Sequence, residues 1–322
     1  MATVEKRMVL VSGSINQKLA QDISKQLNHP LADVALEQFA NGEIYARYNE
    51  SVRGADVFII QSVVGRVNDA LMEVLIMADA AKRASARTVT AVLAHYGYAR
   101  QDKKSAAREP ITAKLVANLY SVAGVDRIIT IDLHQGQIQG FFDEPVNHLT
   151  ALQLFADYFN AKGFDKDNLV VVSPDVGRAK AAKKLSDLME CSIAIMHKGR
   201  PQHNVAEITS VIGDVEGKIC IINDDMIDTA GSITAGVKAL KNLGVGDIYV
   251  CATHGIFSGP AVERLQNSDI KEVVVTDAVP APDTDIFDKL VTLSVAPLFA
   301  RAIKNVFEEE SVSTLFDPNF AL

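Results

Sequence analysis

The sequence lacks the long apolar segments that would place it in or across a membrane. No stretch of its 322 residues approaches the ~20 apolar residues that a membrane-spanning helix needs. The amino-terminal segment, MATVEKRMVLVSGS, has too short an apolar run for a signal peptide. We therefore expect a cytoplasmic protein that does not bind a membrane.

Cysteine and excess positive charge are also scarce. The three cysteines, Cys191, Cys220 and Cys251, follow no metal-ligand spacing, and their odd number favours buried, reduced thiols. Lys and Arg number 32 against 40 Asp and Glu, a formal net charge of −8, which argues against non-specific nucleic-acid binding. Local basic clusters can still serve a small anionic substrate.

What the sequence does contain is an alternation of two kinds of segment. Short runs such as ADVFIIQS, NLVVVSPD and KEVVVTDA are continuously apolar, as strands buried on both faces of a parallel sheet are. Segments with apolar residues at helical spacing separate them, among them Asn68–Arg83, Ile111–Ala123 and Ser232–Leu243. The pattern predicts an α/β protein with mostly parallel sheets flanked by helices.

The length and a weak internal echo favour two domains. A helix, a strand, a His and a Gly follow one another in Asn68–Gly97 and again in Ser232–Gly255. A duplicated unit and the general likeness of α/β units explain this echo equally well. We place the domains at residues 1–149 and 150–322, with the C-terminal segment free to pack back on the first domain.

Ionisable side chains gather just after several of the expected strands. In open α/β sheets, ligands bind at the carboxyl ends of the strands, so these positions are the first candidates for a functional site. They are His95, Asp132, His134, Asp175, Asp224, Asp225 and His254.

The stretch IINDDMIDTAGSITAG, residues 221–236, combines an anion cradle with acidic residues. Its small turn, Asp228–Ser232, offers backbone N–H groups and hydroxyls at the start of an expected helix. It is not a P-loop, because Val237 and Lys238 stand where Lys and Ser or Thr are required.

The acids of this stretch repel phosphate, so we expect them to contact another part of the ligand. A pair of carboxylates such as Asp224 and Asp225 suits the vicinal hydroxyls of a sugar, bridged where needed by Mg²⁺. Capping of the helix explains one acid but hardly the three that include Asp228. The stretch therefore predicts a site for a ribose 5-phosphate group.

This stretch resembles the phosphoribosyl-binding motif of the type I phosphoribosyltransferase fold, and the whole chain resembles the ribose-phosphate pyrophosphokinase family. The resemblance implies two similar phosphoribosyltransferase-like domains. It also implies transfer of the pyrophosphoryl group of ATP to the anomeric hydroxyl of ribose 5-phosphate, giving phosphoribosyl pyrophosphate (PRPP) and AMP for nucleotide biosynthesis. The blocks that carry it are FANGEIYARYNESVRGADVFIIQS, GYARQDKKSAAREPITAKL, DLHQGQIQGFFDEPVNHL, VVSPDVG, HKGRPQHNVAE and GPAVERL.

The resemblance further implies roles for individual residues. Catalysis is assigned to Lys198 and Arg200, in a polar loop after a strand, and Mg²⁺ to His134 and Asp175. The segment FANGE is expected to reach adenine from a neighbouring subunit. The residues implied in ATP binding are Phe39, Asn41, Gly42, Glu43, Arg100, Gln101, Asp102 and Lys103. Those implied in ribose 5-phosphate binding are Arg200, Asp224, Asp225, Asp228, Thr229, Ala230, Gly231 and Ser232.

When the family resemblance is left aside, several of these segments have more than one interpretation. The density of Arg and Lys in residues 95–109 suits a nucleoside triphosphate, and a solvated basic loop is the alternative. A lone histidine such as His134 is more often structural than a ligand. The polar segment Met196–Glu207 reads equally well as an exposed flexible loop or as a cationic loop that closes over phosphate.

Two residues depart from the pattern of the family, which usually has Asp at Asn41 and often has Gly at Arg178. We expect Asn41 still to accept a hydrogen bond from the adenine amino group. We expect Arg178 to turn outward and pair with a surface acid. The family also implies hexamers, inhibition by ADP and activation by phosphate, with Ser311–Phe316 as a candidate regulatory segment.

Two other functions are weighed against this one. A phosphoribosyltransferase that consumes PRPP would share the acidic phosphate loop but would not need the ATP-type blocks FANGE and ARQDKK. A non-catalytic regulatory subunit of the same fold would be expected to lose its loop chemistry, whereas the four residues implied in catalysis and metal binding are all present.

Overall fold

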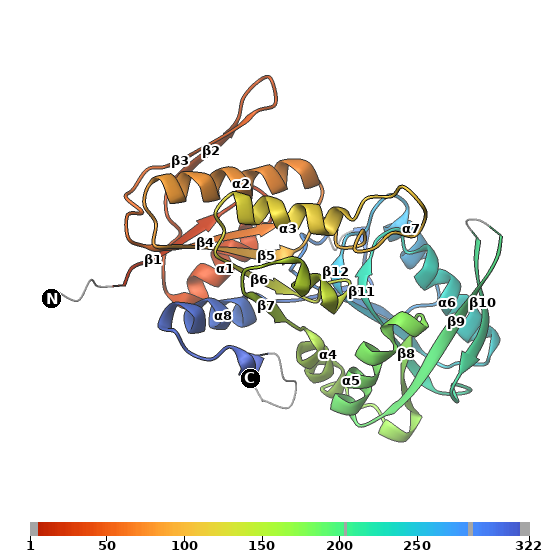
Figure 1. Cartoon of the computed structure of the whole chain (residues 1–322). Coiled ribbons are helices and arrows are strands. Elements are labelled where there is room, and N and C mark those ends of the chain that lie inside the picture. Colours follow the sequence, from red (N-terminus) through yellow and green to blue (C-terminus); the bar gives the residue numbers. More distant parts are fainter. Residues whose placement is uncertain (1–5, 203–204, 283–285, 316–322) are drawn as a thin grey trace. The chain divides into compact units, whose positions relative to one another are not determined.

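The computed structural model describes residues 6–202, 205–282 and 286–315, the side chains of 198–209 and 314 excepted (Figure 1). The chain forms two compact units. The first comprises Met1–Thr150 and Ser294–Leu322, and the second comprises Ala151–Leu293. Each contains a mostly parallel sheet with flanking helices, which confirms the predicted α/β class.

The first unit is built on a five-stranded parallel sheet. Its strands are rich in β-branched residues and buried on both faces, and every residue of the second strand in the sheet is buried. In sheet order they are β1 (Met8–Ser12), β4 (Asp56–Ser62), β5 (Thr88–His95), β6 (Arg127–Ile131) and β7 (Val146–Leu149). A short 3-10 turn, η1 (Gly136–Phe141), precedes the last strand.

Four helices cover the two faces of this sheet. In Figure 1, α2 (Val67–Arg83) and α3 (Thr112–Val122) lie on one face, and α1 (Gln17–Leu27) and α8 (Ala296–Glu308) lie on the other. The last two come from opposite ends of the chain and pack against each other. The ammonium group of Lys6 adds to this junction, since it pairs with Glu309 and donates to the carbonyl of Phe307 at 3.4 Å.

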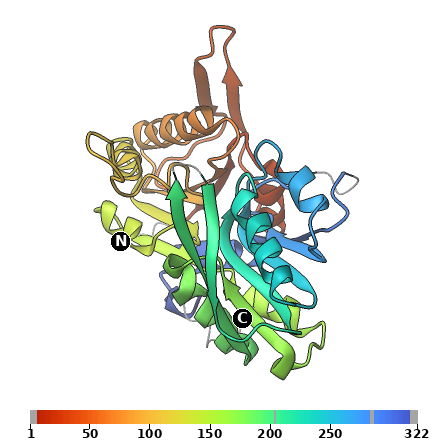
Figure 2. The same ribbon diagram turned by 90° about the vertical axis from the view of Figure 1, so that its right-hand side faces the viewer.

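A separate two-stranded antiparallel sheet extends away from the rest of the first unit. It consists of β2 (Val34–Gln38) and β3 (Ile44–Tyr48), and Figures 1 and 2 both show it projecting as an arm. Its base is held to α2, where the Tyr48 hydroxyl donates to the carbonyl of Met77 at 3.1 Å. Its tip is the FANGE segment.

The second unit is built on a seven-stranded sheet, parallel except at one edge. The sheet order is β10 (Val205–Ile212), β9 (Ser192–Gln202), β8 (Leu169–Ser173), β11 (Ile219–Ile227), β12 (Ile248–Gly255), β13 (Glu272–Thr276) and β14 (Leu290–Leu293). The helices are α4 (Leu152–Asn160), α5 (Ala179–Met189), α6 (Gly231–Asn242) and α7 (Ala261–Gln266). Short 3-10 turns are η2 (Lys166–Asn168) and η3 (Val176–Arg178) in this unit, and η5 (Ser313–Leu315) in the first.

The strand order of the second unit reverses between β8 and β11. From β8 the chain passes through α5 to β9 on one side, and after β10 it returns to β11 on the other side. Open α/β sheets bind ligands beyond the carboxyl ends of the two strands at which such a reversal occurs. Asp175 follows β8, and Asp224 and Asp225 lie in the last part of β11.

The prediction of a polar loop over Met196–Glu207 is wrong for the backbone. The strand β9 continues through Lys198 and Arg200 to Gln202 and forms an antiparallel hairpin with β10. Lys198 is opposite Ile208 in this ladder. The sequence-based reading failed because Gly and Pro weaken the strand signal, whereas an antiparallel partner supplies the backbone hydrogen bonds along an irregular register.

Across the described ranges, no helix has both the length and the apolarity that crossing a bilayer requires.

Candidate functional site

Two adjacent carboxylates lie near the carboxyl end of β11, where the strand order of the second unit reverses. The strand β11 pairs with β8 only as far as Ile222 opposite Val172, so Asp224 and Asp225 continue past the end of that neighbour. The backbone N–H of Asp225 donates to Oδ1 of Asp224 at 2.9 Å. Their side chains are 19% and 3% exposed, respectively, so the pair is largely shielded from water.

Arg178 faces this carboxylate pair. Its Nε lies 3.7 Å from Oδ1 of Asp224 and 3.8 Å from Oδ1 of Asp225, and its side chain is only 17% exposed. The expected outward orientation is therefore wrong. The 3-10 turn η3, capped by Asp175 through a 3.1 Å bond from the Arg178 N–H, carries the side chain toward β11, where two shielded carboxylates attract it.

Burial and a neighbouring carboxylate oppose the ionisation of Asp224. Burial raises the pKa of Asp224 well above its usual value, the adjacent Asp225 raises this pKa further, and the Arg178 guanidinium lowers it. Nε of Arg178 is buried and makes no hydrogen bond among the described residues. One guanidinium thus faces two carboxyl groups at 3.7 and 3.8 Å, beyond hydrogen-bond distance from its Nε. Hydroxyl donors of a sugar or a further cation would complete the arrangement.

A tight loop follows the pair and leads into α6. Ala230 adopts a left-handed conformation, with φ of 58°, and α6 begins at Gly231. The side chains of Thr229 and Ser232 are exposed, whereas Ala230 is buried. Backbone N–H groups at the start of a helix together with hydroxyls suit an anion. The left-handed residue of this loop is thus Ala230, one position before Gly231, the glycine of the motif.

A second segment holds this loop from one side. The N–H of Phe257 donates to the carbonyl of Ile227, and that of Ser258 to the carbonyl of Asp228, both at 3.0 Å. Nη1 of Arg264, on α7, donates to the carbonyl of Thr229 at 2.9 Å. In the sequence, the block GPAVERL, which contains Arg264, indicated only the resemblance to the family. Nothing in its spacing predicted this contact.

In the first unit, the FANGE segment forms the tip of the β2–β3 hairpin. The Phe39 N–H donates to the Glu43 carbonyl at 2.8 Å, and Gly42 takes a φ of 92°. Phe39 is 49% exposed, and its ring centroid is 5.8 Å from that of Tyr45. Asn41 fits this tip with both ends of its amide: Oδ1 accepts from the Glu43 N–H at 3.1 Å, and Nδ2 donates to the Glu43 carboxylate at 2.9 Å.

The basic segment lies in a turn region between β5 and α3. Arg100, Gln101 and Lys103 are exposed, whereas Asp102 is buried. Gln101 is tied to α3, because its Oε1 accepts from the Thr112 hydroxyl at 2.5 Å and its carbonyl from the Ala113 N–H at 3.1 Å. The four residues predicted to bind ATP here therefore share one loop, from which two cations reach solvent.

The residues predicted to bind a metal fall in different units. His134 follows β6 in the first, and Asp175 follows β8 in the second. No group of three or more His, Cys, Asp or Glu side chains suited to a metal occurs in the described part of the chain. The side chains of Lys198 and Arg200 lie outside the described residues, and only their backbone position in β9 is given.

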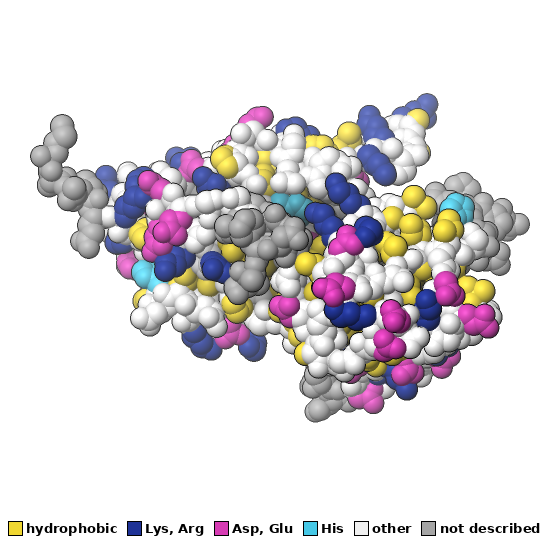
Figure 3. Space-filling model, turned by 90° about the horizontal axis from the view of Figure 1, so that it is seen from below, with side chains coloured by type: hydrophobic (Ala, Val, Ile, Leu, Met, Phe, Trp, Pro, Cys, Tyr) yellow, Lys and Arg dark blue, Asp and Glu magenta, His cyan; other side chains and the backbone are white. Residues whose placement is uncertain are grey.

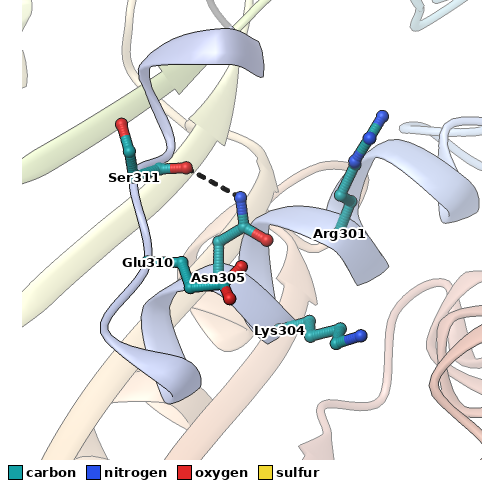
Figure 4. Close-up of a pocket in the computed structure, with 5 residues that line it drawn as sticks. All are labelled: Arg301, Lys304, Asn305, Glu310 and Ser311. Atoms are coloured by element: carbon teal, nitrogen blue, oxygen red, sulfur yellow. Dashed lines mark hydrogen bonds between the residues drawn. The ribbon is translucent and has the colours of Figure 1, made fainter.

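A surface pocket of about 550 Å³ lies beside α8 in the first unit (Figure 4). It is lined by Arg301, Lys304, Asn305, Glu310 and Ser311, and Nδ2 of Asn305 donates to the Ser311 carbonyl at 2.8 Å. This pocket contains none of the predicted substrate residues. It touches the start of the candidate regulatory segment, of which Phe316 lies outside the described residues.

Charged side chains of both signs are interspersed on the face seen in Figure 3. This distribution agrees with the small negative net charge of the chain. Positive charge is therefore a local feature of particular loops rather than of that whole face.

Comparison with known proteins connects these observations. A family model for the N-terminal domain of ribose phosphate pyrophosphokinase matches residues 8–124, and one for the phosphoribosyl synthetase-associated domain matches residues 200–317. A ribose-phosphate pyrophosphokinase of Fusobacterium nucleatum is 50% identical over 308 residues, which cover 96% of this chain and 98% of the relative. The chain belongs to the ribose-phosphate pyrophosphokinase family. The enzyme of Bacillus cereus is 51% identical over 302 residues, covering 94% of this chain and 95% of the relative.

A solved structure supports the same membership. The phosphoribosylpyrophosphate synthetase of Mycobacterium smegmatis superposes with a TM-score of 0.89 at 45% identity, covering 94% of this chain and 99% of the other. The fold and the function implied by the resemblance are thus confirmed: this pyrophosphokinase is an enzyme that forms PRPP. The PRPP-consuming transferase and the non-catalytic subunit are set aside by relatives of this identity and coverage.

Proposed function

We propose that this pyrophosphokinase binds ribose 5-phosphate at the carboxyl end of β11. The observation that carries the assignment is the succession of two shielded carboxylates, Asp224 and Asp225, and the anion-type loop Asp228–Ser232 in one strand–turn–helix segment. The carboxylates accept hydrogen bonds from the sugar hydroxyls. The loop amides and the hydroxyls of Thr229 and Ser232 bind the 5-phosphate. Each charge type therefore has its own end of the substrate.

ATP is assigned to residues of the first unit. The exposed cations Arg100 and Lys103 suit the triphosphate, and Gln101 and Asp102 belong to the same loop. Phe39 offers an exposed aromatic face for adenine at the end of the projecting hairpin, with Asn41, Gly42 and Glu43 beside it. We further propose that this arm serves a neighbouring subunit in a hexamer. The exposure of Phe39 supports this reading.

Catalysis is assigned to Lys198 and Arg200. The anomeric hydroxyl attacks the β-phosphorus of ATP in line, and AMP leaves. Two cations placed at the transferred group stabilise the charge that develops on the phosphate oxygens and on the leaving group. Both residues lie on the hairpin β9–β10 at one edge of the sheet. This position supports a role in which the hairpin approaches the substrate from one side.

Mg²⁺ is assigned to His134 and Asp175. Magnesium is usually held by one or two protein ligands together with substrate phosphates, so a site with few protein donors fits it. Asp175 meets this requirement while its Oδ1 also caps η3. When bound, the ion draws charge from the phosphate oxygens. The three free cysteines, two of them buried, support a reducing compartment such as the cytoplasm.

The assignment is tested by product analysis with the purified enzyme. Incubation with ATP and ribose 5-phosphate should release AMP and PRPP in equal amounts, and AMP release should require the sugar phosphate. Release of ADP in place of AMP would refute pyrophosphoryl transfer. Calorimetric titration of ribose 5-phosphate into Asp225→Asn should show weakened binding, with ATP binding retained. Unchanged ribose 5-phosphate binding in that variant would contradict the assignment of the carboxylates.

A further inference from the structure

We propose that Arg264 is a positioning residue for the 5-phosphate of the sugar substrate. Its guanidinium fixes the phosphate loop through the Thr229 carbonyl and adds positive charge where the phosphate binds. This inference rests on the proposed ribose 5-phosphate site at Asp228–Ser232, and it adds a residue to that site.

The contacts place the guanidinium against the loop itself. Nη1 donates to the Thr229 carbonyl at 2.9 Å, one residue before the left-handed Ala230. A Cβ atom added to Gly231 would lie 3.4 Å from the same Nη1 and 3.9 Å from the Thr229 hydroxyl. Arg264 therefore lies beside the first residue of α6, at van der Waals distance from the position that a Cβ atom would take there.

Arg264 lies in the last turn of α7, where a cation is favourable, but its guanidinium also lies beside the first residue of α6. The N-terminus of α6 already carries the positive end of the helix dipole, and a cation beside it is unfavourable in the absence of an anion. No carboxylate of the described residues lies within 4.0 Å of the Arg264 guanidinium, and neighbouring Glu263 does not pair with it. A bound phosphate dianion would remove the unfavourable interaction with both cationic groups.

The geometry of arginine suits this double task. A guanidinium has five N–H donors in a rigid fork, and one of them is engaged with the Thr229 carbonyl in this structure. Arg264 is exposed, so its other donors are accessible to a ligand. The anchored Nη1 limits their freedom, so that less entropy is lost when the phosphate binds.

The test compares substitutions that separate charge from hydrogen bonding. Arg264→Ala should raise the Kd of ribose 5-phosphate, measured by calorimetry, about tenfold, the size expected for a lost charge-assisted contact. Arg264→Gln keeps a donor for the Thr229 carbonyl but no charge, and it should show most of the same loss. Arg264→Lys should recover part of the affinity. The KM of ATP should stay within about twofold, because the change acts on one substrate.

Controls make each outcome decisive. Lys238→Ala removes a cation from the exposed face of α6, two turns further on, and should leave both substrates unaffected. Equal melting temperatures of Arg264→Gln and the parent chain exclude misfolding. Wild-type affinity in Arg264→Gln would overturn the proposal, since charge would then be irrelevant. Gly231→Val separates the role of Arg264 from the assignment of the phosphate loop. If this variant weakens ribose 5-phosphate binding and the Arg264 variants do not, only the role of Arg264 is refuted. If none of these variants changes the Kd, the loop assignment fails with it.

Discussion

The Nε atom of Arg178, the last residue of the turn η3, lies 3.7 Å from Oδ1 of Asp224. The pair is mostly shielded from solvent, so its Coulomb energy is less screened than that of a surface pair. Arg178 thereby offsets part of the repulsion between Asp224 and Asp225. The guanidinium lowers the pKa of Asp224, so we infer that it favours the ionised form of this carboxyl group.

Replacing Arg178 by Ala should therefore shift a pH profile. Without the guanidinium, the raised pKa of Asp224 rises further, so a higher pH is needed to ionise this group. The acidic limb of kcat/KM for ribose 5-phosphate should move to higher pH, and affinity at neutral pH should fall. The inhibition constant of pyrophosphate should change by less than about tenfold, because the guanidinium is directed at the acids. If the pH dependence of kcat/KM is the same in the variant and the parent chain, Arg178 has no part in the site.

Asp224→Asn should stabilise the fold at neutral and alkaline pH. Burial and Asp225 raise the pKa of Asp224 in the folded state, so its folding contribution is favourable below the unfolded pKa and is lost as pH rises through the folded value. An amide carries no charge to desolvate, and the cost disappears. Thermal melts at pH 5 and pH 8 should show a larger gain at pH 8, together with weaker ribose 5-phosphate binding. A melting temperature lowered at both values would show that the ion pair with Arg178 outweighs the burial cost.

Gly231→Val should weaken ribose 5-phosphate binding far more than ATP binding. The backbone at Gly231 is not left-handed, so strain is no part of the effect. A Cβ atom there meets Arg264 and the Thr229 hydroxyl only at contact distance, but the γ-methyl groups of valine extend further and block the approach of phosphate to the helix amides. Separate calorimetric titrations of the two substrates measure this difference. Equal losses for both would indicate general misfolding.

Lys198→Ala should lower kcat by several orders of magnitude and leave ATP binding nearly intact. The reason is that a cation acting on developing charge stabilises the transition state more than the ground state. Rates of AMP release at saturating substrates, with the ATP Kd measured separately, provide the comparison. Near-normal turnover would show that the assigned role is wrong.

Asn41→Asp should loosen the tip of the β2–β3 hairpin. The amide nitrogen of Asn41 donates to the Glu43 carboxylate, and a second carboxylate at this position would repel it. Because the tip is exposed, the free energy of unfolding should change by less than about 1 kcal/mol. The KM of ATP should change more than that of ribose 5-phosphate. Equal KM values for ATP in the two chains would show that this tip takes no part in ATP binding.

The sequence predicted what periodicity and composition control. The buried strands β4, β8 and β11 and the helices α2, α3 and α6 follow from apolar runs and helical spacing. The hairpin β9–β10 was not predicted, because β9 contains Gly and Pro and forms a strand only through its hydrogen bonds with β10. The orientation of Arg178 and the contact of Arg264 with Thr229 were also missed. Both join residues more than thirty positions apart, and single-sequence patterns carry no information on such pairs.

The junction of α1 with α8 constrains the order in which a nascent chain can fold. The second unit is one continuous stretch, complete once residue 293 has emerged from the ribosome, whereas the first unit needs residues from both ends. Until α8 is synthesised, α1 lacks the helix against which it packs. The unit that begins first in translation is therefore the one that finishes last, and its exposed apolar surface is the part of the nascent chain that chaperones would recognise.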